Sequence, residues 1–136
     1  MKAIVCKTYG PPENLVLEEI DDPVAAENEA VVQIYSASLN FPDGLQIQGK
    51  YQFQPPMPFT PGSEVGGVIT SVGAGIQGFA VGDRVMATPG IGGLAEQVAV
   101  KADGLRKIPD SMDFKTAAGF AMIYTTSYYA LKQRAQ

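Results

Sequence analysis

Histidine is absent from the 136-residue sequence, and Cys6 is its single cysteine. Zinc sites in proteins are built largely from histidine and cysteine side chains in sets of three or four, so this chain lacks the residues for such a site. One cysteine also excludes an intramolecular disulfide, which fits a reducing compartment and favours a cytoplasmic location. Cys6 lies in an alternating segment, where we expect a small buried apolar residue rather than a reactive thiol.

Long hydrophobic runs and a surplus of positive charge are also lacking. No run reaches the roughly 18 apolar residues of a membrane-spanning helix, and the first residues read as a strand rather than as a signal peptide. With 10 basic and 14 acidic residues, the formal net charge is −4. Nucleic acid and anionic membranes both attract basic surfaces, so we expect neither to be the main partner.

The hydrophobic content of 46% over 136 residues is enough for one core, which predicts a single ordinary domain. Up to about residue 110, turn residues divide the chain into short β-rich segments. Many short strands with Gly and Pro turns predict a mainly β fold, either a partly open barrel or a sandwich. The expected strands are Ala3–Tyr9, Val16–Ile20, Ala30–Ala37, Val68–Val72, Arg84–Ala87, Glu96–Lys101 and Leu105–Ile108.

Helical patterns replace the β pattern near the end of the chain. Ser111 or Asp113 can cap a first helix, and a second helical run spans Thr126–Gln133. The segment 40–61 is rich in Pro, Gln and aromatic residues and is expected to be a loop with one helical turn. We therefore divide the chain into a β domain, residues 1–112, and a helical segment, residues 113–136.

A glycine-rich stretch at 73–78 satisfies the G-x-G-x-x-G pattern of dinucleotide-binding loops. That pattern binds pyrophosphate only when its last glycine opens a helix. Here the turn pair Gly82-Asp83 follows after three residues, so no helix fits. The stretch is better explained as a hairpin between two strands.

Three ordered motifs carry a family resemblance: G-S-E-V-G-G-V-I at 62–69, F-x-x-G-D-R-V at 79–85 and G-G-x-A-E at 92–96. Over residues 1 to about 131 the chain resembles the catalytic domain of medium-chain dehydrogenase/reductases, within the zinc-free quinone oxidoreductase (zeta-crystallin-like) branch. The resemblance implies a GroES-like, partly open barrel with short C-terminal helices. The Rossmann nucleotide-binding domain that follows in full-length members is absent from this chain.

The resemblance also indicates that the zinc ligands of related enzymes are missing. Zinc alcohol dehydrogenases place a cysteine where this chain has Leu39-Asn40 and a histidine where it has Ser63. The four-cysteine structural lobe of those enzymes is missing as well. A zinc-independent enzyme is therefore implied.

Candidate site residues follow from two motifs. The run 39–43 resembles the N-F-x-D motif of quinone reductases, which implies that Asn40, Phe41 and Asp43 approach the nicotinamide of NADPH. Asn40 offers an amide donor and an acceptor; its composition context alone favours the cap of a short helix, and the resemblance favours the cofactor role instead. Thr126 and Tyr129 lie in a run that resembles G-L-T-x-Y-x-x-L, whose threonine faces the nicotinamide. Thr126 could instead sit in a helix interior and bond back to a carbonyl.

Further residues complete the expected site. Tyr51 aligns with a tyrosine of the substrate pocket, whereas a second pocket tyrosine of the branch is Leu45 here. We expect Asn40, Tyr51 and Thr126 to act as catalytic residues and to face one cleft. Glu64 is expected to be a structural partner of a buried amide or arginine, because an unpaired buried carboxylate is costly.

Other residues in these motifs have structural interpretations. Asp83 and Arg84 are expected to form a turn and its ion pair, and Glu96 to order the entry of the following strand. Met57, Phe59 and Phe53 fit a pocket wall or the core equally well.

The resemblance implies the substrate-binding half of an NADPH-dependent oxidoreductase, acting on a small quinone or α,β-unsaturated carbonyl and compatible with a homodimer. This fragment is expected to be inactive, because it has no helix N-terminus of its own to hold the dinucleotide phosphates. The alternative is a stand-alone GroES-like barrel that serves as a non-enzymatic binding or interaction module, since fold alone does not imply function.

Overall fold

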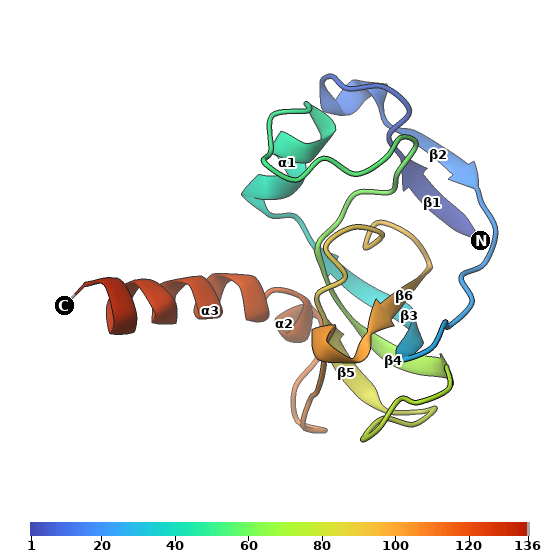
Figure 1. Ribbon diagram of the computed structural model, residues 1–136, viewed down its shortest axis with the longest axis vertical. Coiled ribbons are helices and arrows are strands. Elements are labelled where there is room, and N and C mark those ends of the chain that lie inside the picture. The colour runs from blue at the N-terminus through green and yellow to red at the C-terminus, as the bar shows by residue number, and fades with distance from the viewer. Residues whose placement is uncertain (136) are drawn as a thin grey trace.

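The computed structural model describes residues 1–135. Its body is a five-stranded antiparallel sheet in the order β6–β3–β4–β5–β7, which curls into a partly open barrel (Figure 1). A two-stranded antiparallel sheet, β1–β2, packs beside it. The strands are β1 Lys2–Val5, β2 Val16–Glu19, β3 Glu29–Ser38, β4 Glu64–Val72, β5 Arg84–Ala87, β6 Gln97–Lys101 and β7 Leu105–Lys107. The predicted mainly β fold is confirmed.

The core lies inside the curl of the large sheet. It is built from small and β-branched side chains that alternate along the strands, as expected for sheets with one buried face. Isolated bridges, Ala3 with Ala95 and Cys6 with Phe59, attach the N-terminal strand to the barrel. Cys6 is buried as predicted, and this burial raises the pKa of its thiol. The main core cluster comprises Ala30, Val32, Val65, Ile69, Val85, Ala87, Val98, Val100 and Leu105.

Most predicted strands are present, but β4 begins at Glu64 and not at Val68. The predicted strand left out Gly66 and Gly67, whereas both glycines lie inside β4, where neighbours come very close. A Cβ on Gly66 would stand 2.6 Å from the carbonyl oxygen of Phe114. The missing side chain therefore lets the helix that contains Phe114 pack onto the sheet.

The glycine-rich stretch at 73–78 forms the connection between the antiparallel strands β4 and β5. Gly75 and Gly78 have φ values of 79° and 78°, a region that glycine adopts without strain. No helix intervenes before β5. The hairpin interpretation is confirmed.

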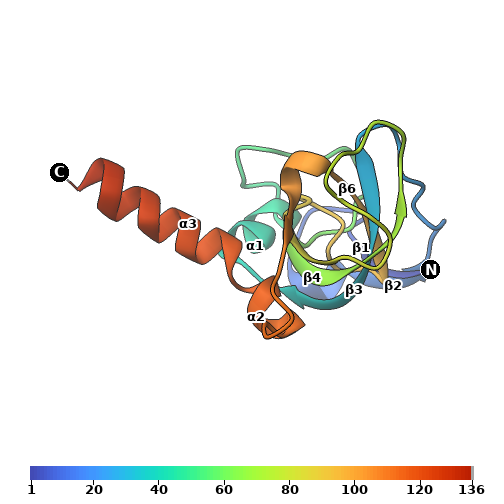
Figure 2. The ribbon, with the colours of Figure 1, turned by 90° about the horizontal axis from the view of Figure 1, so that it is seen from below.

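Residues 1–135 also form three α-helices and short helical turns: α1 Phe41–Ile47, α2 Phe114–Ala118, α3 Ala121–Tyr129, the 3-10 turns Pro12–Asn14 and Ala102–Gly104, and a π-helical turn Ala130–Arg134. Asp113 caps α2, since its Oδ1 accepts a hydrogen bond of 2.7 Å from the Thr116 N–H, and this bond lowers the pKa of Asp113. The last helix begins at Ala121, earlier than the predicted Thr126. Figure 2 shows α2 against the barrel and α3 extending away from it. Within residues 1–135, no helix combines the length and apolar character needed to cross a bilayer.

The expected ion pair between Asp83 and Arg84 is wrong. Asp83 pairs with Lys107 at 2.9 Å, and this contact lowers the pKa of Asp83. Arg84 donates to the carbonyl oxygens of Pro109 and Met112, at 3.0 and 2.6 Å, and its guanidinium lies 4.7 Å from the ring centroid of Phe114. Neighbouring residues at the start of a strand point to opposite faces of the sheet, so their side chains do not meet.

Candidate functional site

Glu64 is the buried centre of the candidate site. It opens β4 opposite Ser38, the last residue of β3, and its exposed fraction is 0%. Its Oε2 accepts hydrogen bonds from Ser38 Oγ at 3.0 Å and from Asn40 Nδ2 at 3.3 Å. Its Oε1 accepts from the backbone N–H of Met122 at 3.0 Å. The structural role predicted for Glu64 is confirmed, and its partners are amides and a hydroxyl rather than an arginine.

The bond from Met122 gives α3 a cap that its own sequence lacks. Phe120 stands at the N-cap position and makes no capping bond with its side chain. A carboxylate near the first N–H groups of a helix satisfies an otherwise unpaired donor and interacts favourably with the helix dipole. Glu64 therefore fixes where α3 starts relative to the barrel.

The side chain of Asn40 is oriented by the same carboxylate. Carboxylate oxygens accept hydrogen bonds, so the NH2 group of Asn40, and not its carbonyl oxygen, faces Glu64. That group also donates to Ser38 Oγ at 3.0 Å. Asn40 is also the N-cap of α1, and its backbone N–H donates to Asp43 Oδ2 at 2.7 Å. The capping alternative is thus realised, and the amide of Asn40 is held by Ser38 and Glu64.

A first pocket, which we call the α1 pocket, has a volume of about 550 Å³. Its polar side chains are those of Asn40 and Asp43, and Asp43 is 4% exposed. The remaining wall is almost entirely apolar and comes from the N-terminal strand, the first 3-10 turn, α1 and two loops. It consists of Ile4, Pro12, Leu15, Leu39, Gly44, Ile47, Pro61 and Leu94.

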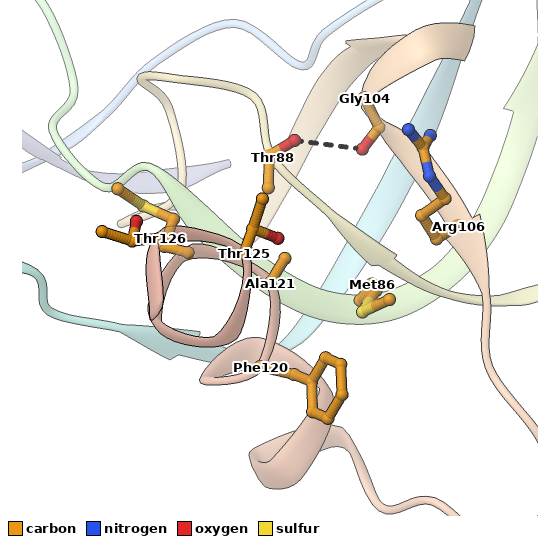
Figure 3. A pocket seen from close by; sticks show the side chains of 9 residues that line it. Met86, Thr88, Gly104, Arg106, Phe120, Ala121, Thr125 and Thr126 are labelled. Atoms are coloured by element: carbon orange, nitrogen blue, oxygen red, sulfur yellow. Dashed lines mark hydrogen bonds between the residues drawn. The ribbon is translucent and has the colours of Figure 1, made fainter. Parts of the chain in front are cut away.

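A second pocket, which we call the α3 pocket, has a volume of about 480 Å³. Figure 3 shows Thr125 and Thr126 on α3 at one side and Met86 and Arg106, from β5 and β7, across from them. In the same view the hydroxyl of Thr88 donates to the carbonyl oxygen of Gly104 at 3.4 Å. The floor near the start of α3 is apolar. The full lining is Met86, Thr88, Gly104, Arg106, Phe120, Ala121, Met122, Thr125 and Thr126.

The predicted site residues are divided between these two pockets. Asn40 and Asp43 line the α1 pocket and Thr126 lines the α3 pocket, whereas Tyr51, which is half-buried, lines neither. Phe41 and Tyr129, 81% and 49% exposed, also lie outside both linings. Asn40 and Thr126 thus lie in different pockets, and Glu64 connects the two linings through its hydrogen bonds with Asn40 and Met122. A shared role of Asn40, Tyr51 and Thr126 stays a prediction.

Sequence reasoning missed Met122 and Gly44 as parts of the site. The bond to Met122 comes from its backbone N–H, which no side-chain pattern reveals. The sequence contained one indirect signal. The helix begins with an apolar residue and has no local cap, so its first N–H groups need an acceptor from elsewhere in the chain. Gly44 lines the α1 pocket inside a helix, where glycine is otherwise unfavourable.

Known proteins resemble this chain over nearly its whole length. The model of the alcohol dehydrogenase GroES-like domain matches residues 26–110. The quinone oxidoreductase-like protein 2 homolog of Nematostella vectensis is 38% identical over 139 residues, covering 98% of this chain and 37% of that protein. The chain thus spans about two-fifths of the length of such relatives.

Solved structures of oxidoreductases also resemble this chain over nearly its whole length. A probable oxidoreductase from Mycobacterium abscessus superposes with a TM-score of 0.92 at 40% identity, over 98% of this chain and 43% of the other. Escherichia coli quinone oxidoreductase, crystallised with NADPH, gives a TM-score of 0.91 at 29% identity, over 98% of this chain and 41% of the other. The chain therefore belongs to the alcohol dehydrogenase GroES-like domain family, within the quinone oxidoreductase branch of the medium-chain dehydrogenase/reductases.

Proposed function

We propose that this chain is the substrate-binding part of a zinc-independent, NADPH-dependent quinone or enone reductase. The observation that carries the proposal is the α1 pocket, whose volume of about 550 Å³ and apolar wall suit a flat, uncharged ring. Pockets of roughly 300–1,000 Å³ with a few polar groups are typical of small-molecule sites. Quinone oxidoreductases among the relatives, two of them crystallised with NADPH, support the same assignment.

Residues of this chain would bind and orient the substrate. Reduction by hydride leaves negative charge on a substrate oxygen, and hydrogen-bond donors near that oxygen stabilise it. The amide of Asn40 is a side-chain donor that lines the α1 pocket, and Ser38 and Glu64 hold it in place. The hydroxyl group of Thr126 lines the α3 pocket.

NADPH supplies the hydride when it is bound, and this chain offers residues for its nicotinamide end alone. Phe41, Thr126 and Tyr129 are exposed, and Asn40 and Asp43 lie at the nearby α1 pocket. Within residues 1–135 the 73–78 turn opens no helix, so it does not supply the amide cradle that a pyrophosphate needs. The cofactor phosphates would require a nucleotide-binding domain beyond residues 113–136.

The exposed side of α3 supports an attachment of that kind. Phe120, Tyr124, Tyr128 and Leu131 are 36%, 60%, 64% and 74% exposed and recur at helical spacing along one stripe. Apolar surface of this extent on a projecting helix favours burial against another domain or a second copy of the chain. We propose the nucleotide-binding domain as the occupant, with a cytoplasmic location for the whole enzyme.

Calorimetry of the 136-residue chain tests the proposal. We expect saturable binding of duroquinone, a tetramethyl quinone without a free ring position for thiol addition. NADPH should show no binding at micromolar concentration, and quinone-dependent NADPH oxidation should stay at background. Micromolar affinity for NADPH would contradict the proposal and restore residues 73–78 as a phosphate loop, whereas failure to bind duroquinone would favour a non-enzymatic barrel module.

Metal removal gives a second expected result. No group of three or more metal-binding side chains occurs among residues 1–135. Protein prepared without an affinity tag should contain far less than one zinc per chain by elemental analysis. A chelator should leave Tm unchanged, because no metal-linked term contributes to folding. Stoichiometric zinc whose removal lowers Tm would contradict zinc independence.

A further inference from the structure

Arg106 is the single charged residue among the described residues that line the α3 pocket. Its side chain is exposed and forms no ion pair within residues 1–135. Nη1 of Arg106 donates to the backbone carbonyl oxygens of Asp103 and Leu105, at 2.7 and 2.6 Å. These two bonds hold the guanidinium group in place. Nε and Nη2 donate to no acceptor in the part of the chain that the structure describes, so they are available to a ligand.

Nε and Nη2 form one edge of the guanidinium group. Their N–H bonds point in parallel from that edge and match the two oxygens of a carboxylate, which arginine binds through two charge-assisted hydrogen bonds. A phosphate monoester carries up to two negative charges at neutral pH. The pocket lining has no second cation to compensate the additional charge. The free edge of Arg106 therefore favours a singly charged, planar carboxylate.

The rest of the α3 pocket suits the body of such a ligand. The hydroxyl groups of Thr125 and Thr126 lie across from Arg106 (Figure 3) and donate no hydrogen bond within residues 1–135. A hydroxyl can donate to a ligand oxygen. The volume of about 480 Å³ lies in the range of small-molecule sites, so it has room for more than the carboxylate alone. The apolar side chains of the lining are those of Met86, Phe120, Ala121 and Met122.

We propose that the α3 pocket is a second ligand site, which binds a small organic carboxylate through Arg106 and packs the apolar body of this ligand against Met86 and Phe120. The α1 pocket cannot serve the same ligand, because its charged side chain is that of Asp43, and two carboxylates repel each other. The two pockets thus differ in the sign of the charge that they accept. The inference does not depend on whether the α1 pocket binds a quinone.

Benzoate and benzamide test the inference, because they have nearly the same shape and differ in charge. Kd values would be measured at low ionic strength, where salt screens the charges least, by NMR titration of the isotope-labelled chain. The variants are Arg106→Gln and Thr125→Val, which removes the hydroxyl and keeps the shape of the side chain. Arg134→Gln is the matched control, since it removes the same charge from an exposed residue outside both pockets.

We expect benzoate to bind saturably, with chemical-shift changes at Arg106 and Thr125, and benzamide to bind about tenfold or more weakly. Arg106→Gln should weaken benzoate binding by a similar factor, Thr125→Val by about threefold, and Arg134→Gln should leave it unchanged. If Arg106→Gln does not fold, Thr125→Val and the comparison with benzamide decide.

Three results would overturn the inference. Benzoate could bind no better than benzamide, or benzoate could bind the folded Arg106→Gln variant as well as it binds the unaltered chain. Tighter binding of phenyl phosphate than of benzoate would show that the site is not selective for a carboxylate. Each of these results leaves the proposed function of the α1 pocket standing, because that function is tested with duroquinone.

Discussion

Glu64→Gln is expected to lower the free energy of unfolding by about 2–3 kcal/mol, although the two side chains have nearly the same shape. The backbone N–H of Met122 needs an acceptor, so the single oxygen of glutamine should turn toward it. The amide nitrogen of glutamine would then face the NH2 group of Asn40, donor against donor. A lost bond to a charged group and a buried unpaired donor each cost roughly 1–3 kcal/mol. Chemical denaturation would measure the loss.

A second substitution tests whether the loss arises from this contact. Asn40→Asp alone should also destabilise the chain, because it places a second carboxylate against the buried carboxylate of Glu64. In the double variant, the glutamine that replaces Glu64 can donate to the new carboxylate, which remains a good helix cap, so at least half of the loss should be recovered. Glu13→Gln, on an exposed 3-10 turn, is the matched control and should have little effect. Simple additivity of the two single effects would show that the side chains do not interact.

Gly67→Ala is expected to destabilise the barrel strongly, although it adds a single methyl group. Gly67 lies in β4 between β3 and β5, opposite Ile34 and Val85. An added Cβ would overlap the carbonyl oxygen of Gln33 and stand 2.9 Å from Val32 Cγ1, so the backbone of β3 would have to move. Overpacking of this kind costs about 1–3 kcal/mol and sometimes more, and we expect the upper end.

The same substitution in α1 provides the comparison. Gly44→Ala meets no neighbour within 4 Å and replaces a helical glycine, so it should raise the free energy of unfolding by up to about 1 kcal/mol. Thermal unfolding of the two variants should therefore shift Tm in opposite directions. A stable Gly67→Ala protein would mean that β3 and β4 are further apart than in this structure.

Local sequence signals predicted the elements whose ends are set locally. Strand β5 follows a turn and matches its predicted bounds, and Asp113 caps α2 as expected. The start of α3 was missed because its cap, Glu64, lies 58 residues away in the sequence. The start of β4 was missed because two adjacent glycines, Gly66 and Gly67, favour a turn when only the local sequence is considered. In the fold they let neighbouring elements come close to β4.

Motif resemblance pointed to Asn40, Asp43 and Thr126, which line pockets, and also to Phe41, Tyr51 and Tyr129, which line neither pocket. It did not reveal that Glu64 binds the amide of Asn40, because that contact depends on how β3 and β4 pair where Ser38 and Glu64 lie opposite each other. It also did not reveal that Asn40 and Thr126 line different pockets.

Locating a bound quinone tests the central claim, that the α1 pocket is the substrate site. Duroquinone carries four equivalent methyl groups, which give one intense signal in isotope-filtered NMR of the labelled chain. We expect intermolecular NOEs from these methyl groups to Leu15, Ile47 and Leu94, which line the α1 pocket. NOEs confined to Met86 and Met122 in the α3 pocket, or to exposed Phe41, would contradict the claim.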